Sequence, residues 1–167
     1  MKRVLVIIDF QKDFVDGALG SEAAQKIVDP LVNYITNFNG DVIGTKDTHT
    51  NDYLNTQEGL NLPIPHCIKN TPGWEYDEKI TPYIKRTVYK STFGSTYLAE
   101  LIKKEQYDIV EFCGLVTDIC VVSNVLLTKS INPEIEILVH KDFCAGTTPE
   151  AHEAALLTMK SCQIKII

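Results

Sequence analysis

The sequence predicts an α/β fold: a three-layer α/β/α domain around a mostly parallel, Rossmann-like sheet of about six strands. Two observations lead to this prediction. Short apolar runs rich in β-branched residues recur along the chain, and helix-length segments separate them. The runs are almost entirely apolar, which is typical of parallel strands covered on both faces. A chain of 167 residues with 44% hydrophobic content fits one domain with a full core, spanning residues 1–167.

The first strand is expected at Val4–Ile8, where Asp9 ends an apolar run. A basic head precedes this run, as in a signal peptide, but the run is short and no small-residue cleavage site follows it. The other strands are expected wherever a similar run recurs. They are Gly40–Thr45, Arg86–Tyr89, Tyr107–Cys113, Glu136–Val139 and Gln163–Ile166.

Helices are expected between these strands. In the first of them, Ile27, Leu31, Ile35 and Phe38 recur at helical spacing, and the last begins with a proline in its first turn. The expected helices are Ala23–Phe38, Ser95–Lys104, Asp118–Lys129 and Pro149–Lys160. Residues 46–80 have neither pattern. A loop of this length in a compact domain usually has a function.

Charge and cysteine content narrow the range of partners. The net charge of −6 argues against binding to nucleic acid or to an anionic membrane surface, and no apolar stretch is long enough to span a membrane. Five irregularly spaced cysteines without a CxxC pair favour reduced thiols in a cytoplasmic protein. Composition therefore argues against nucleic-acid and membrane partners.

Chemically capable side chains follow four of the expected strands. Asp9 follows the first strand, Asp47 and His49 the second, Lys90 the third and Cys120 the fourth. The carboxyl ends of parallel strands meet at one edge of the sheet, where ligands bind. The sequence therefore predicts an active site at this edge.

Cys120 lies in the stretch "GLVTDIC", between an expected strand and an expected helix. The N–H groups at a helix N-terminus stabilise a thiolate and lower the pKa of a cysteine. Asp9 could then transfer the proton of a Cys120 nucleophile, and Lys90 could favour the thiolate. The alternative is that Cys120 fills the core, Asp9 caps a helix and Lys90 is solvated.

A metal site is predicted from the acidic and imidazole side chains of the long loop, namely Asp47, His49, Glu58 and His66. Mixed oxygen and nitrogen ligands suit zinc, manganese or iron more than calcium or magnesium. The alternative is a polar loop whose histidines cap turns. Several apolar side chains could either line a pocket for a flat ring or pack in the core; these are Phe14, Leu19, Trp74 and Phe93. Cys67 is interpreted as packing, and His152 as a surface residue.

Six motifs occur in an order that matches a known family. They are "VIIDFQKDF", "TKDTHT", "PHC" followed by "TPGWE", "VYKSTF", "CGLVTDICV" and "DFCAGTTPEAHEAAL". Together they resemble the isochorismatase-like cysteine hydrolases, and the nicotinamidases most closely. The resemblance extends from Arg3 to about Lys160, which is nearly the whole chain.

The resemblance implies specific roles for these residues. Asp9, Lys90 and Cys120 would form the catalytic triad. A cis peptide at Val116–Thr117 would turn the Thr117 amide toward that of Cys120, which makes an oxyanion hole. Asp47, His49 and His66 would ligate the metal, with Glu58 at the place of a variable fourth ligand, and Phe14, Leu19 and Phe93 would contact the substrate ring.

The implied function is a metal-dependent cysteine amidohydrolase that converts nicotinamide to nicotinate and ammonia through a thioester, for NAD salvage. One divalent metal is implied, zinc ahead of manganese or iron. Two departures bear on the substrate: "NLPIPH" lacks the aromatic residue common before His66, and the chain is short between Lys90 and Cys120. The pocket is then more open, or a neighbouring subunit of a homo-oligomer completes it. Hydrolysis of another small amide, or a catalytically silent metal-binding domain, are the alternative functions.

Overall fold

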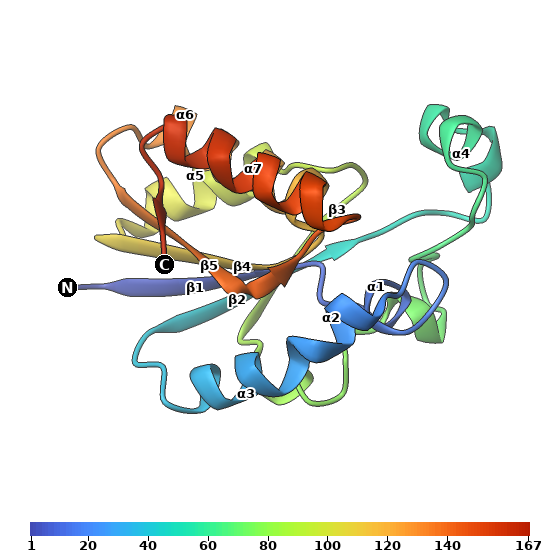
Figure 1. Cartoon of the computed structure of the whole chain (residues 1–167), viewed down its shortest axis with the longest axis horizontal. Helices are drawn as coiled ribbons and strands as arrows, with labels where there is room; N and C mark the ends of the chain where they lie inside the picture. The colour runs from blue at the N-terminus through green and yellow to red at the C-terminus, as the bar shows by residue number, and fades with distance from the viewer.

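The computed structural model describes all 167 residues and confirms the predicted α/β class (Figure 1). Six strands form one sheet in the order β3-β2-β1-β4-β5-β6, and every neighbouring pair is parallel. The strands are β1 Arg3–Ile8, β2 Asp41–Asp47, β3 Arg86–Lys90, β4 Ile109–Leu115, β5 Glu136–Ala145 and β6 Lys165–Ile166. The strand order reverses between β1 and β4, so the crevice beyond their carboxyl ends is the expected ligand site.

Helices cover both faces of the sheet, as Figure 1 shows. On one face lie α5 Thr96–Glu105, α6 Val122–Ile131 and α7 Pro149–Ser161, and on the other lie α2 Glu22–Lys26 and α3 Val28–Thr36. The side-chain oxygens of Ser21, Ser95 and Thr148 accept hydrogen bonds from the first turns of α2, α5 and α7. None of these helices is long and apolar enough to cross a membrane. Between the two helical layers, β1 is fully buried from Val4 to Ile8.

Two helical segments differ from the sequence prediction. The helix expected at Ala23–Phe38 is divided into α2 and α3, because Pro30 has no N–H to donate to the carbonyl of Lys26. A new helix begins there instead, with Leu31 N donating to Ile27 O at 3.1 Å. A short helix that the sequence did not predict, α1 Lys12–Val15, follows Asp9.

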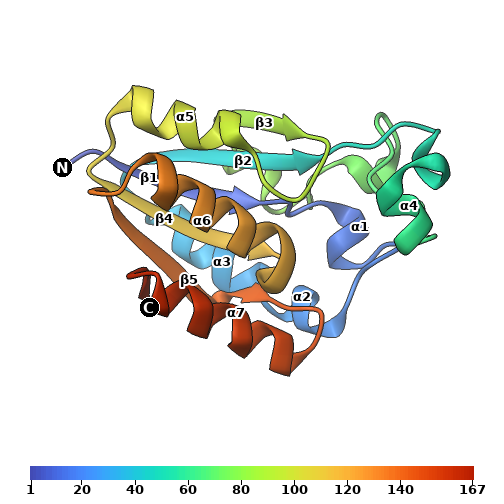
Figure 2. The same cartoon turned by 90° about the horizontal axis from the view of Figure 1, so that it is seen from above.

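Most of the long segment 46–80 lies beyond the carboxyl ends of β1 and β2 (Figure 2), although its first two residues, Lys46 and Asp47, are the last two of β2. Beyond β2 it contains α4 Gln57–Asn61 and two short 3-10 turns, Tyr53–Asn55 and Pro72–Trp74, in agreement with the expected lack of a further strand or a long helix. Trp74 anchors the segment: its Nε1 donates to Thr48 Oγ1 at 2.9 Å, and Lys46 Nζ lies 3.8 Å from the centre of the Trp74 ring. The segment is thus held on the end of the sheet where the site was predicted.

Candidate active site

Four buried polar residues meet at the carboxyl edge of the sheet, where the sequence placed them. Asp9 follows β1 directly, Asp47 ends β2, Lys90 ends β3, and Cys120 lies in the turn between β4 and α6. Their exposed fractions are 0%, 4%, 6% and 4%. Each strand therefore delivers one side chain to a shared, water-poor region.

Lys90 lies at the centre of the first cluster. Its Nζ is 2.5 Å from Asp9 Oδ2 and 3.7 Å from Cys120 Sγ, and it donates to the carbonyl of Thr92 at 3.0 Å. The second oxygen of Asp9 accepts a hydrogen bond of 2.6 Å from Thr45 Oγ1. The structure thus brings Asp9, Lys90 and Cys120 together. It adds Thr45, which the sequence analysis did not predict as part of this cluster.

Burial controls the protonation of this cluster. It raises the pKa of Asp9, with a further contribution from the charge of Asp47 and a partial offset from Lys90. Burial and the Asp9 charge also raise the pKa of Cys120 well above its ordinary value. Burial alone would lower the pKa of Lys90, but the charges of Asp9, Cys120 and Asp47 together outweigh it and raise this pKa. The expectation of a lowered thiol pKa at a helix end is therefore wrong, because Cys120 is desolvated beside a carboxylate.

The carboxylates and imidazoles of the long segment form a second cluster next to the first. One potential ligand atom from each of Asp47, His49, Glu58 and His66 lies within 4.8 Å of the others. His49 Nε2 is 3.0 Å from Asp47 Oδ2 and 3.6 Å from Glu58 Oε1. His66 Nε2 is 3.6 Å from Asp47 Oδ2 and 3.7 Å from Glu58 Oε1.

The donor set of this cluster fits a divalent transition metal. His66 Nδ1 bonds the carbonyl of Ile64 at 2.8 Å, so that its Nε2 lone pair faces the other ligand atoms. Asp47 Oδ1 is buried and has no hydrogen-bond partner. Two imidazoles and two carboxylates are ligands that zinc, manganese or iron accept. Burial alone would raise the pKa of Asp47, but hydrogen bonds with His49 and His66 and the charge of Lys90 lower it, so Asp47 is an anion.

Two side chains that the sequence analysis missed hold this arrangement. Gln11 Nε2 donates to the carbonyls of Asp47 and Trp74, both at 2.9 Å, and Gln11 Oε1 accepts from Asp47 N at 2.8 Å. Asn124 Nδ2 donates to the carbonyl of Cys120 at 2.8 Å. Both side chains are fully buried. A fully buried amide needs hydrogen-bond partners, so a polar residue at an apolar position was the available signal.

A cavity of about 350 Å³ opens onto both clusters. Cys120, Asp47, Glu58 and His66 contribute to its wall, and so do the three expected ring contacts, Phe14, Leu19 and Phe93. The segment before His66, which lacks the expected aromatic residue, contributes Leu62. Trp74, the fourth apolar candidate, packs on Lys46 instead.

The loop ahead of Cys120 requires a correction. The cis peptide is Leu115–Val116, one bond earlier than expected at Val116–Thr117. Neither bond involves a proline, so the residue types did not distinguish them. Val116 and Cys120 line the cavity, whereas Thr117 is fully buried and contacts His152 Nδ1 through its hydroxyl at 2.8 Å. His152 is thus half-buried in a specific contact and is not the free surface residue that was expected.

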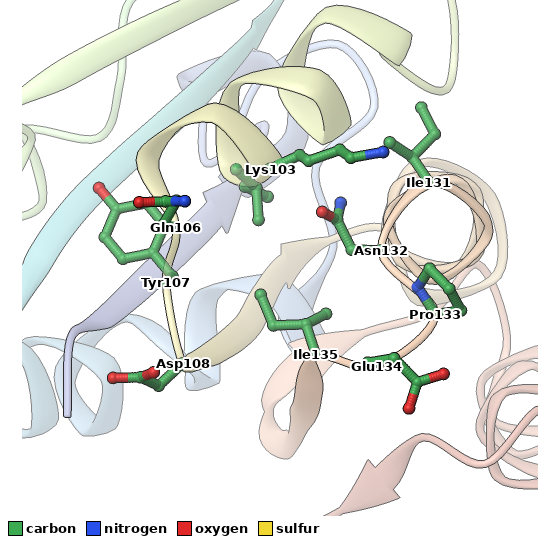
Figure 3. A pocket seen from close by; sticks show the side chains of 10 residues that line it. Lys103, Gln106, Tyr107, Asp108, Ile131, Asn132, Pro133, Glu134 and Ile135 are labelled. Atoms are coloured by element: carbon green, nitrogen blue, oxygen red, sulfur yellow. The ribbon is translucent and has the colours of Figure 1, made fainter.

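A second cavity of about 400 Å³ lies at the opposite end of the sheet, between the last turns of α5 and α6 (Figure 3). No histidine or cysteine lines it. Asn132, at its centre, donates to the carbonyls of Ala99 and Thr128 at 3.0 and 3.3 Å, which ties the two helix ends together. The cysteine and the histidines of the two clusters are at the other end.

Comparison with known proteins agrees with this geometry. A family profile described as Isochorismatase domain matches residues 3–167. An isochorismatase family protein of Bacillus subtilis (strain 168), PncA, is 32% identical over 174 residues, which cover 93% of each chain.

Two solved structures are similar throughout. The crystal structure of nicotinamidase/pyrazinamidase PncA from Bacillus subtilis has a TM-score of 0.86 and 27% identity over 99% of each chain. The pyrazinamidase of Pyrococcus horikoshii, in complex with zinc, has a TM-score of 0.83 and 28% identity, covering 100% of this chain and 99% of the other. On the match over residues 3–167, this chain belongs to the isochorismatase family.

Proposed function

We propose that this protein is a metal-dependent cysteine amidohydrolase that converts nicotinamide to nicotinate and ammonia through a thioester. One observation carries the proposal: Cys120 and the Asp47, Glu58 and His66 ligand set line the same cavity, which has apolar walls. The names of the similar structures, nicotinamidase/pyrazinamidase and pyrazinamidase, support it.

The first half-reaction uses the Asp9–Lys90–Cys120 cluster. Cys120 Sγ attacks the amide carbon, and its proton passes to Asp9, whose raised pKa suits a group that takes up and returns a proton. Asp9 then protonates the leaving nitrogen, so that ammonia departs and a thioester remains. In the second half-reaction Asp9 takes a proton from water, whose oxygen attacks the thioester carbon. The C–S bond then breaks, the carboxylate product leaves, and Asp9 returns the proton to the Cys120 thiolate. Lys90, 2.5 Å from Asp9 and 3.7 Å from the sulfur, offsets negative charge on either group.

The oxyanion that forms at each attack needs N–H donors beside Cys120. Sequence analysis assigned this role to the amides of Thr117 and Cys120. Because Val116 lines the cavity and Thr117 does not, we assign it to the amides of Val116 and Cys120.

The ring of the substrate would lie between Phe14, Leu19 and Phe93, with its nitrogen toward the metal ligands. A divalent metal, held by Asp47, His49, Glu58 and His66, would supply a Lewis acid for that nitrogen. Fixing the ring at both ends would place the amide carbon against Cys120, and such placement is itself a large contribution to rate. The role in NAD salvage, the cytoplasmic location and a possible homo-oligomer belong to the same proposal.

The test combines metal analysis of the purified protein with ammonia release from nicotinamide, pyrazinamide and benzamide. We expect about one transition metal ion per chain and rapid hydrolysis of the two amides with a ring nitrogen. Benzamide has the same shape without that nitrogen, so it should be a poor substrate. Efficient metal-dependent hydrolysis of benzamide would contradict the role of the ring nitrogen. Metal binding without hydrolysis of any small amide would indicate a catalytically silent domain.

A further inference from the structure

The turn that carries Cys120 is held from two sides. On the α6 side, Asn124 Nδ2 bonds the carbonyl of Cys120 at 2.8 Å. On the α7 side, the hydroxyl of Thr117 contacts His152 Nδ1 at 2.8 Å. Asp118 joins the same side, because its two carboxylate oxygens accept hydrogen bonds from Thr147 N at 2.8 Å and Thr147 Oγ1 at 2.6 Å.

Of the contacts on the α7 side, Thr117–His152 is the more buried one. Thr117 is fully buried, and His152, half-buried in the first turn of α7, is the partner of its hydroxyl. A buried hydroxyl without a partner is unfavourable, so the pair constrains where Thr117 can lie. Thr117 is one residue from Val116 and three from Cys120, the two residues whose amides we assign to the oxyanion.

Close packing leaves the turn little freedom to move toward α7. Gly146 lies between the two elements and also lines the cavity. A Cβ atom at this position would be 2.7 Å from His152 Cβ and 2.9 Å from Asp118 Oδ1, so no side chain fits there. The first turn of α7 and the Asp118 side chain of the nucleophile turn are therefore both packed closely against Gly146.

We propose that His152 is a positioning residue for the reaction: through the Thr117 hydroxyl it sets the position of the turn that carries Cys120 and the oxyanion-binding amides. This inference rests on the proposed function. His152 touches neither the metal ligands nor the ring contacts, so its effect falls on the rate of the chemical step. Displacing a nucleophile by about 1 Å costs about 100-fold in rate, so small movements of this turn are costly.

The experiment compares His152→Ala with His152→Asn, which keeps a hydrogen-bonding atom at the position of Nδ1. Glu153→Ala, an exposed change on the same helix, is the matched control. We expect His152→Ala to lower kcat for nicotinamide about 10- to 100-fold with KM and metal content unchanged. His152→Asn should restore most of the rate. A kcat of His152→Ala within twofold of the control, or an equal loss in His152→Asn, would overturn the proposal.

A second pair keeps the test decisive if His152→Ala does not fold. Thr117→Ser retains the hydroxyl and should keep most of the activity, whereas Thr117→Val should match the loss expected for His152→Ala. Equal activity in the two Thr117 variants would overturn the proposal.

Failure of the proposed function has a separate signature, because the wild type would then release no ammonia. In that case the rate of Cys120 alkylation by iodoacetamide reports the geometry of the turn without a substrate. It is measured in a Cys162→Ser background, since Cys162 is the one exposed cysteine. We expect His152→Ala to change this rate severalfold and His152→Asn to leave it near the control; unchanged rates in both would overturn the proposal.

Discussion

The protein contains two buried clusters of carboxylate and imidazole groups, and they differ in one respect that matters. The loop cluster consists of Asp47, His49, Glu58 and His66, and the core cluster consists of Arg3, Tyr34, Glu111 and His140. In the core cluster Glu111 Oε2 accepts from Tyr34 OH at 2.5 Å and contacts His140 Nε2 at 2.7 Å. Glu111 Oε1 accepts from Arg3 Nε at 3.0 Å.

Every acceptor of the core cluster has a donor, and the Arg3 charge balances that of Glu111. The loop cluster has two carboxylates, and Asp47 Oδ1 has no hydrogen-bond partner. Its nearest cation, Lys90, lies 3.7 Å from Asp47 and is already paired with Asp9. Buried charge without a partner is costly, so the loop cluster suits a bound cation, whereas the charges of the core cluster are already balanced. Both clusters contain carboxylate and imidazole groups, but hydrogen-bond and charge satisfaction separate them.

The largest expected effect leaves both clusters intact. Cys120→Ala removes the nucleophile, so nicotinamide turnover should fall by about 10⁴-fold or more, as losses of other nucleophiles do. Metal content and melting temperature should stay close to those of the wild type, because little volume changes. A variant that keeps a substantial fraction of the wild-type rate would show that Cys120 is not the nucleophile.

The second prediction compares the two clusters directly by removing one histidine from each. His49→Ala should lose bound metal and raise KM for nicotinamide at least about 10- to 100-fold, since even changes around a ligand have effects of that size. His140→Ala should keep the metal and KM but lower the free energy of unfolding by about 2 kcal/mol, because Glu111 loses a donor. Metal analysis, steady-state kinetics and urea unfolding of both variants check this.

An equal loss of metal in the two variants would contradict the comparison, because metal binding would then depend on the core cluster as well as on the loop cluster. Full nicotinamide activity of metal-free His49→Ala would make the loop cluster structural.

The third prediction concerns the two glutamates. Glu111→Gln should lower the free energy of unfolding by about 3 kcal/mol, because it removes the charge of a fully buried carboxylate that accepts from three donors, and the melting temperature should fall by about 6–12 °C. Its kcat/KM at 20 °C should stay within about twofold of the wild type. Glu58→Gln is the matched control: it should weaken metal binding with little effect on the metal-free stability. The reverse pattern would mean that the core cluster, and not the loop cluster, binds the metal.

The sequence predicted the edge of the sheet well, for a physical reason. Asp9, Asp47 and Lys90 each lie just after an expected strand, and parallel strands bring such ends together whatever the connections between them. The long segment places Glu58 and His66 beside them. Their spacing in the sequence left this arrangement open, and the family resemblance favoured it. These predictions depended on the periodicity of apolar residues and on the positions of polar residues along the chain, both of which can be read from a sequence.

The core cluster and the supports of the site were harder to predict. Glu111 and His140 interrupt apolar runs, which signals a buried polar group with a partner but does not name the partner. Arg3 and Tyr34 are far from them in the chain, so only tertiary packing reveals the match. The same holds for Gln11 with Asp47 and for His152 with Thr117. The raised pKa of Cys120 was missed because it depends on burial, which local sequence does not specify.

The smallest expected effect tests how the core cluster works. Burial alone would raise the pKa of Glu111, but hydrogen bonds with His140, Tyr34 and Arg3 outweigh burial and lower this pKa to about 2. A lowered carboxyl pKa stabilises the fold above the unfolded value of about 4.3, and this stability is lost as the pH falls toward 2. Tyr34→Phe should therefore cost about 1–2 kcal/mol at pH 7, and the cost should disappear between about pH 4.3 and pH 2.

Urea unfolding at a series of pH values measures this cost. Tyr83→Phe is the control, because the Tyr83 hydroxyl pairs with the uncharged hydroxyl of Thr36 and its small cost should not depend on pH in this range. If the cost of Tyr34→Phe were equally constant down to pH 2, the Tyr34 hydroxyl would stabilise the fold independently of the charge of Glu111. Glu111 would then owe its ionisation to Arg3 and His140, and the core cluster would be satisfied by two donors where we count three.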